Sequence, residues 1–402
     1  MKKLLLLALI PVIYFGFNSS LMFENPVMIF DSPRKYIDLS DFQMSVSLDQ
    51  NLFSIKDVIT MAEGSEVVLD KSKLELMKDG FKLSPVVSMD EYVGLGFGSF
   101  KLGMIVNLRS NISMKLPYEM MEVLFGNVET TDTKESTFNI FNGGLVAKAG
   151  INLGFGIGKN INIGIAGGLY VPMIWFDKNS KAHFLYRSDE DTATVEMKID
   201  GDVRLLSALS SLQNLENLDA NKLTSSAGYY LSIGASAKFG NLKMSGGIND
   251  ISLQPAKLSY EGYSKVSFDA SLVNLELNQS NPTMEIPEDL SELASPEEVS
   301  IPMKLFAAAN YKLSLLNFGA HFKSTTDFED KEFGGYIDLA NILWIDMTNI
   351  GPAWKKTLGL NLDLRILRLS ASIGAIDYAG LFNFDTSKMT GITISARFGM
   401  GF

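Results

Sequence analysis

The chain has 402 residues, of which 46% are hydrophobic, 34 are glycine and none is cysteine, and its formal net charge is −11. The absence of cysteine excludes a disulfide scaffold and thiolate metal sites. The acidic balance argues against nucleic acid as a partner, because a phosphate backbone attracts basic surfaces.

The first 20 residues have the pattern of an export signal. Lys2 and Lys3 precede an almost unbroken apolar stretch, residues 4–14, and small residues follow it. The alternative is an N-terminal membrane anchor, but a spanning helix needs roughly 20 apolar residues, and Pro11 interrupts this stretch. We therefore expect residues 1–20 to be a cleaved signal peptide and residues 21–402 to be the mature domain.

Beyond the signal, apolar residues alternate with small or polar ones in many segments. The clearest pair, residues 145–157 and 161–175, is joined by the turn Gly158-Lys159-Asn160. A strand has period two, so each row occupies one face of a sheet. Long strands joined by tight turns are typical of transmembrane barrels. The same alternation recurs in residues 100–109, 229–239, 242–248, 303–313, 318–322, 358–364 and 367–373.

Four longer segments separate the tight hairpins: residues 49–80, 110–143, 201–225 and 281–300. Outer-membrane barrels have short turns at one end and long loops at the other, so we expect these segments to be extracellular loops. Short helices are expected within the first two, at residues 55–62 and 118–125.

Leucines at helical spacing in residues 201–225 predict a further helix. Its simpler role is a cap that packs on neighbouring loops. The functional alternative is a hydrophobic gate over the lumen, formed by Leu205, Leu209 and Leu212.

The last segment, residues 391–402, alternates without interruption and ends in an aromatic residue. Its apolar row includes Ile394, Phe398, Met400 and Phe402, and the other row is small or polar. It resembles the closing strand of bacterial outer-membrane β-barrels, which the barrel-assembly machinery recognises. A strand of a soluble sheet can also end in this way.

The second row of the predicted strands contains many bases. We expect these side chains to face the lumen, where a basic wall would attract carboxylate headgroups or other anions. The alternative is that they pair with acidic loop or plug segments, or extend to the rims. The candidates are Lys101, Arg109, Lys148, Lys238, Lys243, His321, Arg368 and Arg397.

We therefore predict an all-β protein, a transmembrane antiparallel up-and-down β-barrel of about 14 strands, with a range of about 12 to 16. Short helices would lie in the long loops or in a plug. The segment Phe23-Glu24-Asn25-Pro26-Val27 follows the expected signal.

With these features together, the chain resembles FadL-like outer-membrane barrels, the long-chain fatty-acid transporter group. Many members carry Asn-Pro-Ala near the mature N-terminus, and here Val27 replaces the alanine. The resemblance implies a barrel of this strand number, an N-terminal segment that occupies the lumen, and passage of hydrophobic small molecules. It assigns no residue of a fatty-acid site.

No residue receives a catalytic, cofactor-binding or metal-binding role. The chain has two histidines, His183 and His321, and no nucleophile motif accompanies them. The glycine-rich residues 94–98 and 154–159 lack the spacing of phosphate-binding loops and continue the strand alternation. We therefore do not expect an enzyme.

The leading hypothesis is an outer-membrane barrel that passes small hydrophobic or amphipathic molecules across the outer envelope of a double-membraned bacterium. The alternatives are a general diffusion porin with an open lumen, and a structural or adhesive envelope protein anchored by its barrel. Expected partners are outer-membrane lipid, the barrel-assembly machinery and a hydrophobic ligand. Substrate and oligomeric state do not follow from strand alternation.

Overall fold

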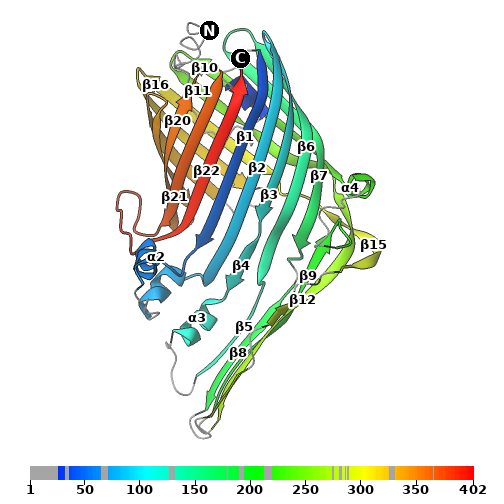
Figure 1. The fold of residues 1–402 in the computed structure, drawn as a ribbon, viewed down its shortest axis with the longest axis vertical. Helices are drawn as coiled ribbons and strands as arrows, with labels where there is room; N and C mark the ends of the chain where they lie inside the picture. Colours follow the sequence, from blue (N-terminus) through cyan, green and yellow to red (C-terminus); the bar gives the residue numbers. More distant parts are fainter. Residues whose placement is uncertain are drawn as a thin grey trace.

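One continuous antiparallel sheet dominates the computed structural model (Figure 1). The structure describes residues 26–31, 36–64, 71–125, 132–178, 180–189, 194–211, 220–273, 276–279, 283–285, 287, 289–325, 331–364 and 366–402. The signal peptide predicted at residues 1–20 lies outside the described residues. Among the described residues, no helix combines the length and apolarity needed to cross a membrane.

Fourteen strands close into a barrel, so the predicted fold class and strand number are confirmed. Strand β22 pairs with β1, with Phe398 opposite Phe42, and this pairing leaves the barrel without a free edge. In order around the barrel the strands are β1 (Ile37–Gln50), β2 (Phe81–Phe97), β3 (Phe100–Asn111), β6 (Phe141–Ile157), β7 (Ile161–Phe176), β10 (Gly228–Phe239), β11 (Leu242–Gln254), β16 (Lys304–Leu313), β17 (Leu316–Thr325), β18 (Lys331–Leu339), β19 (Leu343–Ile350), β20 (Ala353–Asp363), β21 (Leu367–Asp377) and β22 (Met389–Gly401).

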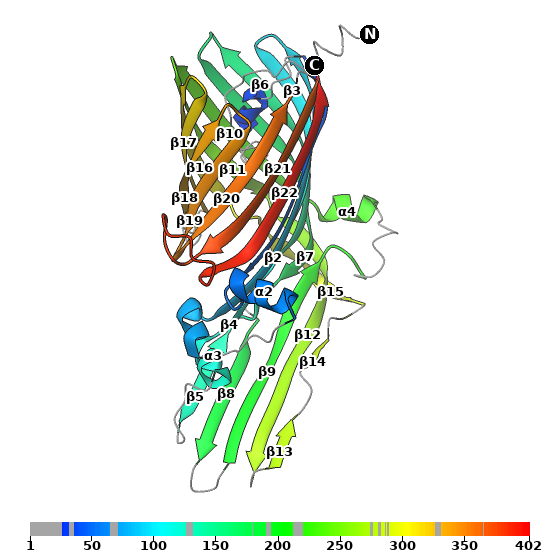
Figure 2. The same cartoon turned by 60° about the vertical axis from the view of Figure 1, so that its left-hand side comes forward.

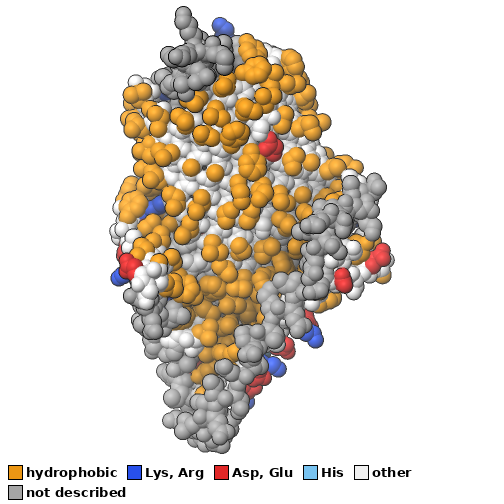
Figure 3. All heavy atoms as spheres, in the orientation of Figure 1, with side chains coloured by type: hydrophobic (Ala, Val, Ile, Leu, Met, Phe, Trp, Pro, Cys, Tyr) orange, Lys and Arg blue, Asp and Glu red, His pale blue; other side chains and the backbone are white. Residues whose placement is uncertain are grey.

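The two faces of the barrel wall have opposite character. Large apolar side chains are exposed on its outer face, and Figure 3 shows them spread over the strands on the visible side. The closing-strand residues Ile394, Phe398, Met400 and Phe402 are among those exposed. Polar and charged side chains on the other row, such as Asp41, Asn152 and Arg397, are buried. This polarity is that of a membrane-spanning barrel.

Tight turns gather at the end of the barrel where Phe402 follows β22 (Figure 1). Gly158 follows β6 with φ +65°, and Gly240 follows β10 with φ +58°. Two-residue and three-residue hairpin turns need this left-handed conformation, which glycine adopts without a steric penalty. The glycine positions therefore explain why these strand pairs reverse within so few residues.

At the opposite end, the sheet continues past the barrel as an extension. Strands β5, β8, β9 and β12 follow one another in it, and β9 joins the barrel by pairing with the last residues of β7. Figures 1 and 2 show it projecting from one side of the rim. Its strands are β4 (Ser113–Leu116), β5 (Thr133–Phe138), β8 (Ala182–Asp189), β9 (Thr194–Ser207), β12 (Ala256–Val273), β13 (Glu276–Gln279), β14 (Thr283–Glu285) and β15 (Ser291–Val299).

The extension has its own hydrophobic core. The 3-10 helix η3 (Lys71–Met77) and helix α3 (Tyr118–Leu124) pack on one face of β8 and β9, where Phe184 and Ile199 are buried. The segments expected to be long loops thus contribute to a folded unit.

The helix predicted over residues 201–225 is wrong for its first part. Residues 201–207 belong to β9, which pairs with β12 along its whole length, and helix α4 covers only Ala220–Ser226. Leucine spacing is a local signal, and pairing with a strand distant in sequence outweighs it. The gate hypothesis fails with it, because Leu205 is buried in the extension core beside Phe176 and Val203. Leu209 follows β9 half-buried, and Leu212 lies outside the described residues.

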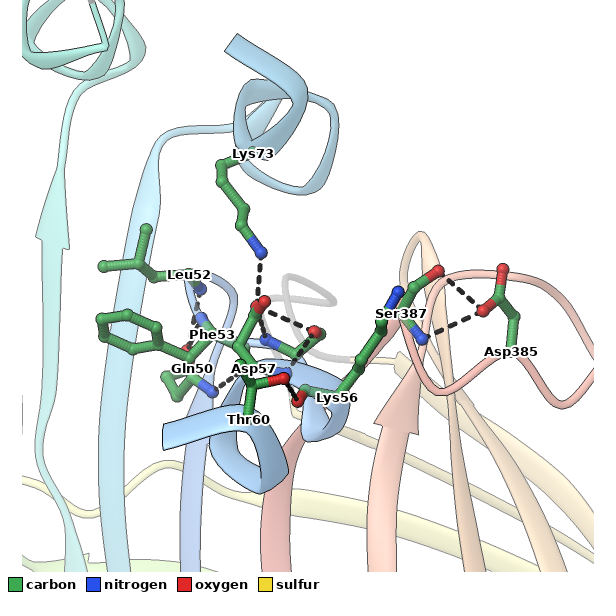
Figure 4. Close-up of polar contacts among 10 residues, drawn as sticks. Gln50, Leu52, Phe53, Lys56, Asp57, Thr60, Lys73, Asp385 and Ser387 are labelled. Atoms are coloured by element: carbon green, nitrogen blue, oxygen red, sulfur yellow. Dashed lines mark hydrogen bonds and ion pairs between the residues drawn. The ribbon is translucent and has the colours of Figure 1, made fainter. Parts of the chain in front are cut away.

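Helix α2 (Ile55–Ala62) occupies the residues predicted for it and begins with a capping box. The Ser54 hydroxyl accepts from the Asp57 backbone N–H, and the Ser54 backbone N–H donates to the Asp57 carboxylate at 2.7 Å. The same carboxylate pairs with Lys73 of η3, as Figure 4 shows. One acidic side chain therefore ties α2 to its own start and to a neighbouring element.

The stability of this capping box is expected to fall in acid. Burial alone would raise the pKa of Asp57, but the Lys73 ammonium and the Ser54 donors hold it below the usual 3.8. A depressed folded-state pKa gives stabilisation that is full above the unfolded-state value and is lost as pH falls through the folded-state value. Hydrogen exchange in residues 55–62, corrected for intrinsic rates, should therefore accelerate below about pH 4. Asp57→Asn should exchange faster at neutral pH and lose this acid dependence; an unchanged dependence would assign the effect to another group.

Candidate functional site

The barrel lumen holds a short N-terminal segment. The 3-10 helix η2 (Pro26–Asp31) lies inside the wall near the end that carries the tight turns (Figure 2). The side chain of Val27 is only 1% exposed. The resemblance to FadL-like barrels implied a segment in this place, and its Pro26 and Val27 come from the Asn-Pro sequence noted above.

Gly164 of β7 makes room for this segment. A Cβ built on Gly164 would lie 2.3 Å from the Pro26 carbonyl carbon and 2.3 Å from the Val27 nitrogen. Real side chains do not approach backbone atoms so closely, so only glycine permits this contact. On the neighbouring wall, the Lys101 Nζ lies 6.0 Å from the ring centre of Phe30. The segment is therefore fitted to the wall by both shape and charge.

Buried ion pairs join the first and last strands beside the lumen. Arg397 of β22 donates from Nε and Nη2 to the two carboxylate oxygens of Asp41 on β1, each at 2.5 Å. Arg368 of β21 donates from Nη2 to Asp363 at 2.9 Å and lies 3.9 Å from Asp41. Two arginines and two carboxylates thus compensate one another across the closing seam of the barrel.

A second cluster centres on Asp250 of β11. Asp250 has φ +60° and occupies an irregularity in the pairing of β10 and β11. Its backbone N–H donates to the Ser232 hydroxyl at 3.1 Å. Its carboxylate lies 2.8 Å from the Lys148 Nζ and 3.8 Å from the Lys304 Nζ. Because two lysines share one carboxylate, this part of the wall carries excess positive charge.

His321 belongs to a third polar cluster. Its Nε2 lies 2.9 Å from Asp346 Oδ2, and the Thr348 hydroxyl donates to Asp346 Oδ1 at 2.6 Å. The Thr348 Oγ1 also lies 3.3 Å from His321 Nε2, so the three side chains form one hydrogen-bonded cluster. Among the described residues, no group of three His, Asp or Glu side chains is arranged to hold a metal ion.

The remaining predicted lumen residues differ in burial. Lys101 and Lys243 are buried, Arg109 is half-buried, and Lys238 is exposed near the turn after β10. The expected excess of bases over acids is not general. Carboxylates were missed on the same rows, among them Asp38, Asp41, Asp90, Asp250 and Asp346.

Some of these acids were visible in the sequence. Residues 41–48 read Asp-Phe-Gln-Met-Ser-Val-Ser-Leu, so Asp41 falls on the polar row of an alternating segment. Asp250 gave no such signal, because the irregularity in β11 interrupts the alternation on which the assignment of faces depends.

No family model and no curated protein matches the chain. Among solved structures it is similar to a mutant of TodX, described as a monoaromatic hydrocarbon channel, at 10% identity over 99% of this chain and 98% of that one, with a TM-score of 0.49. The toluene transporter TodX of P. putida matches at 10% identity over 98% and 96%, with a TM-score of 0.42. A FadL homologue of Pseudomonas aeruginosa matches at 9% identity over 98% and 95%, with a TM-score of 0.46.

Proposed function

We propose that this barrel carries small hydrophobic or amphipathic molecules across the outer membrane through a lumen closed by its N-terminal segment. The observation that carries the proposal is the seat of Pro26–Asp31 inside the wall, with Gly164 shaped to receive it. A general diffusion porin needs a continuous aqueous path, and a segment packed against the wall opposes one. The hydrocarbon named for the TodX channel belongs to the proposed class of cargo.

The location in the outer membrane rests on the closed barrel, its apolar outer face and the expected signal peptide. Phe402 follows the closing strand β22 and accepts a hydrogen bond from the Ile37 backbone N–H of β1, at the seam where an assembly machinery that reads the C-terminal strand would act. A structural or adhesive anchor is the competing function, because the folded extension offers a surface outside the membrane.

Two measurements on the refolded mature protein test the proposal. In planar bilayers we expect no steady large conductance steps, whereas a diffusion porin would show them. In liposomes we expect faster entry of a small aromatic hydrocarbon than in protein-free vesicles. Entry no faster than in protein-free vesicles would favour the anchor, and steady large steps would favour the porin.

The Asp250 cluster predicts the charge preference of the path. Asp250→Asn removes the carboxylate and leaves the positive charges of Lys148 and Lys304, so the entry of amphipathic anions should become faster. Lys148→Met should slow it, and Asp202→Asn, an exposed position on the extension, should leave it unchanged. The measurement is the ratio of entry rates for a carboxylate and an uncharged analogue. Equal ratios in all variants would mean that the Asp250 cluster does not line the path of the transported molecules.

A further inference from the structure

A second feature of the barrel lies outside its lumen, at the rim opposite the tight turns. Helix α2 follows β1 there, and residues 378–388 connect β21 to β22. The Lys56 backbone N–H donates to the Thr386 carbonyl at 3.2 Å, which joins the two segments. Figure 1 shows α2 at the lower left edge of the barrel, beside the loop that connects β21 to β22. We call α2 and residues 378–388 the outer collar.

The outer collar exposes apolar side chains. Ile55, Val58, Ile59 and Ala62 form one stripe along α2, no residue of the helix is buried, and Ile59 is 51% exposed. Phe382, in the connecting loop, is 83% exposed. Removing such apolar surface from water lowers the free energy, so an amphipathic helix normally buries its apolar stripe.

The connecting loop is held on the outer face of the wall. The Lys356 Nζ of β20 lies 2.6 Å from Asp377 Oδ2, donates to the Asn383 carbonyl, and lies 4.1 Å from the ring centre of Phe384. Lys356 and Asp377 are both buried beneath the loop. Lys356 shares the strand row of Leu358 and Leu360, which are exposed outward. The loop therefore covers the outer surface of the wall, and the ring of Phe384 lies against Lys356 on that side.

The outer collar is continuous with the lipid-facing band of the barrel. The exposed row of β1 ends at Leu48, which pairs with Ile392 on β22, and α2 begins a few residues later. The exposed row from Leu39 to Leu48, at about 3.3 Å per residue and tilted about 40°, covers roughly 23 Å, close to the apolar height of known barrels. The outer collar thus lies where the hydrocarbon region gives way to headgroups.

We propose that the outer collar inserts its apolar side chains into the outer leaflet, at the boundary between headgroups and acyl chains. The amphipathic stripe of α2 and the aromatic pair Phe382 and Phe384 fit this layer, in which amphipathic helices and aromatic residues collect. Lys56 and Lys388 are exposed beside them and would meet lipid phosphate groups. The occupant is a lipid surface, and this surface goes beyond the proposed transport function.

Site-directed spin labels test the proposal directly, because the chain has no cysteine of its own. Single variants Ile59→Cys and Phe382→Cys are labelled with a nitroxide in the full mature protein. The protein is then placed in phosphatidylcholine vesicles that contain phosphatidylglycerol. Collisions with oxygen, which concentrates in lipid, and with a water-soluble nickel chelate report the depth of each label.

Two exposed positions calibrate the scale. Ile394→Cys lies on the lipid-facing band, 57% exposed, and Tyr263→Cys lies on the extension, 53% exposed. We expect the oxygen-to-nickel collision ratio at residues 59 and 382 to lie closer to that at 394 than to that at 263. A ratio equal or closer to that at 263, at either position, would overturn the proposal. The collision ratios report the depth of each label and do not depend on transport. Heat-modifiable migration checks separately that each variant is a folded barrel.

Discussion

Asp41→Asn is expected to lower the free energy of unfolding by about 3–5 kcal/mol, because it leaves Arg397 buried without its partner. The Asp41 carboxylate is fully buried and accepts two hydrogen bonds from Arg397, and Arg368 lies near it. Removal of the carboxylate leaves the guanidinium groups of Arg397 and Arg368 without the negative charge that both approach. The pair also spans β1 and β22, so the loss falls on the seam that closes the barrel.

Urea titration of the protein refolded in lipid vesicles measures this loss. Asp202→Asn, in which an exposed carboxylate of the extension is removed, should change the free energy of unfolding by less than about 0.5 kcal/mol. The double variant Asp41→Asn with Arg397→Met should recover part of the stability, because it no longer buries an uncompensated charge at residue 397. A single variant as stable as the wild type would mean that water or Asp363 replaces the lost carboxylate.

Gly164→Leu is expected to open the lumen. The first atom of the new side chain would fall on the backbone of Pro26 and Val27, and backbone cannot rotate away as a side chain can. We therefore expect the segment to leave the wall. If it stayed and its neighbours shifted to admit the leucine, the overpacking would cost about 1–3 kcal/mol. Discrete conductance steps should appear in planar bilayers, where we expect none from the wild type.

Gly167→Leu is the matched control for this variant. It adds the same side chain to the same strand, but Gly167 lies on the opposite row and its Cβ would approach only to 3.3 Å of the Tyr230 carbonyl oxygen. We expect the control to remain closed. A folded Gly164→Leu barrel without conductance would show that the N-terminal segment does not close the path, and would withdraw the argument against an open porin.

The outer collar and the lumen depend on different charged residues of the barrel wall. Lys356 is buried on the outer side, under residues 378–388, whereas Arg397 is buried on the inner side, against Asp41. Neutralising Lys356 should therefore loosen the connecting loop and leave the conductance unchanged. A change in conductance with an intact loop would place Lys356 on the path.

Strand alternation determined the barrel in advance. In residues 391–402 and 161–175 each side chain has only two choices of face, so apolar and polar rows read directly as outside and inside. The turn Gly158-Lys159-Asn160 added where two of these strands reverse. These features are local, and the sequence states them without reference to distant residues.

Only the tertiary structure decided the rest. Residues 201–207 became a strand because β12 pairs with them, and Leu205 entered the core of the extension instead of a gate. Asp250 reached its two lysines through an irregularity in β11 that breaks the alternation. Arg397 contacts Asp41, and Pro26 contacts Gly164, across large separations in sequence. A pattern along the chain does not show which distant residues meet in the fold.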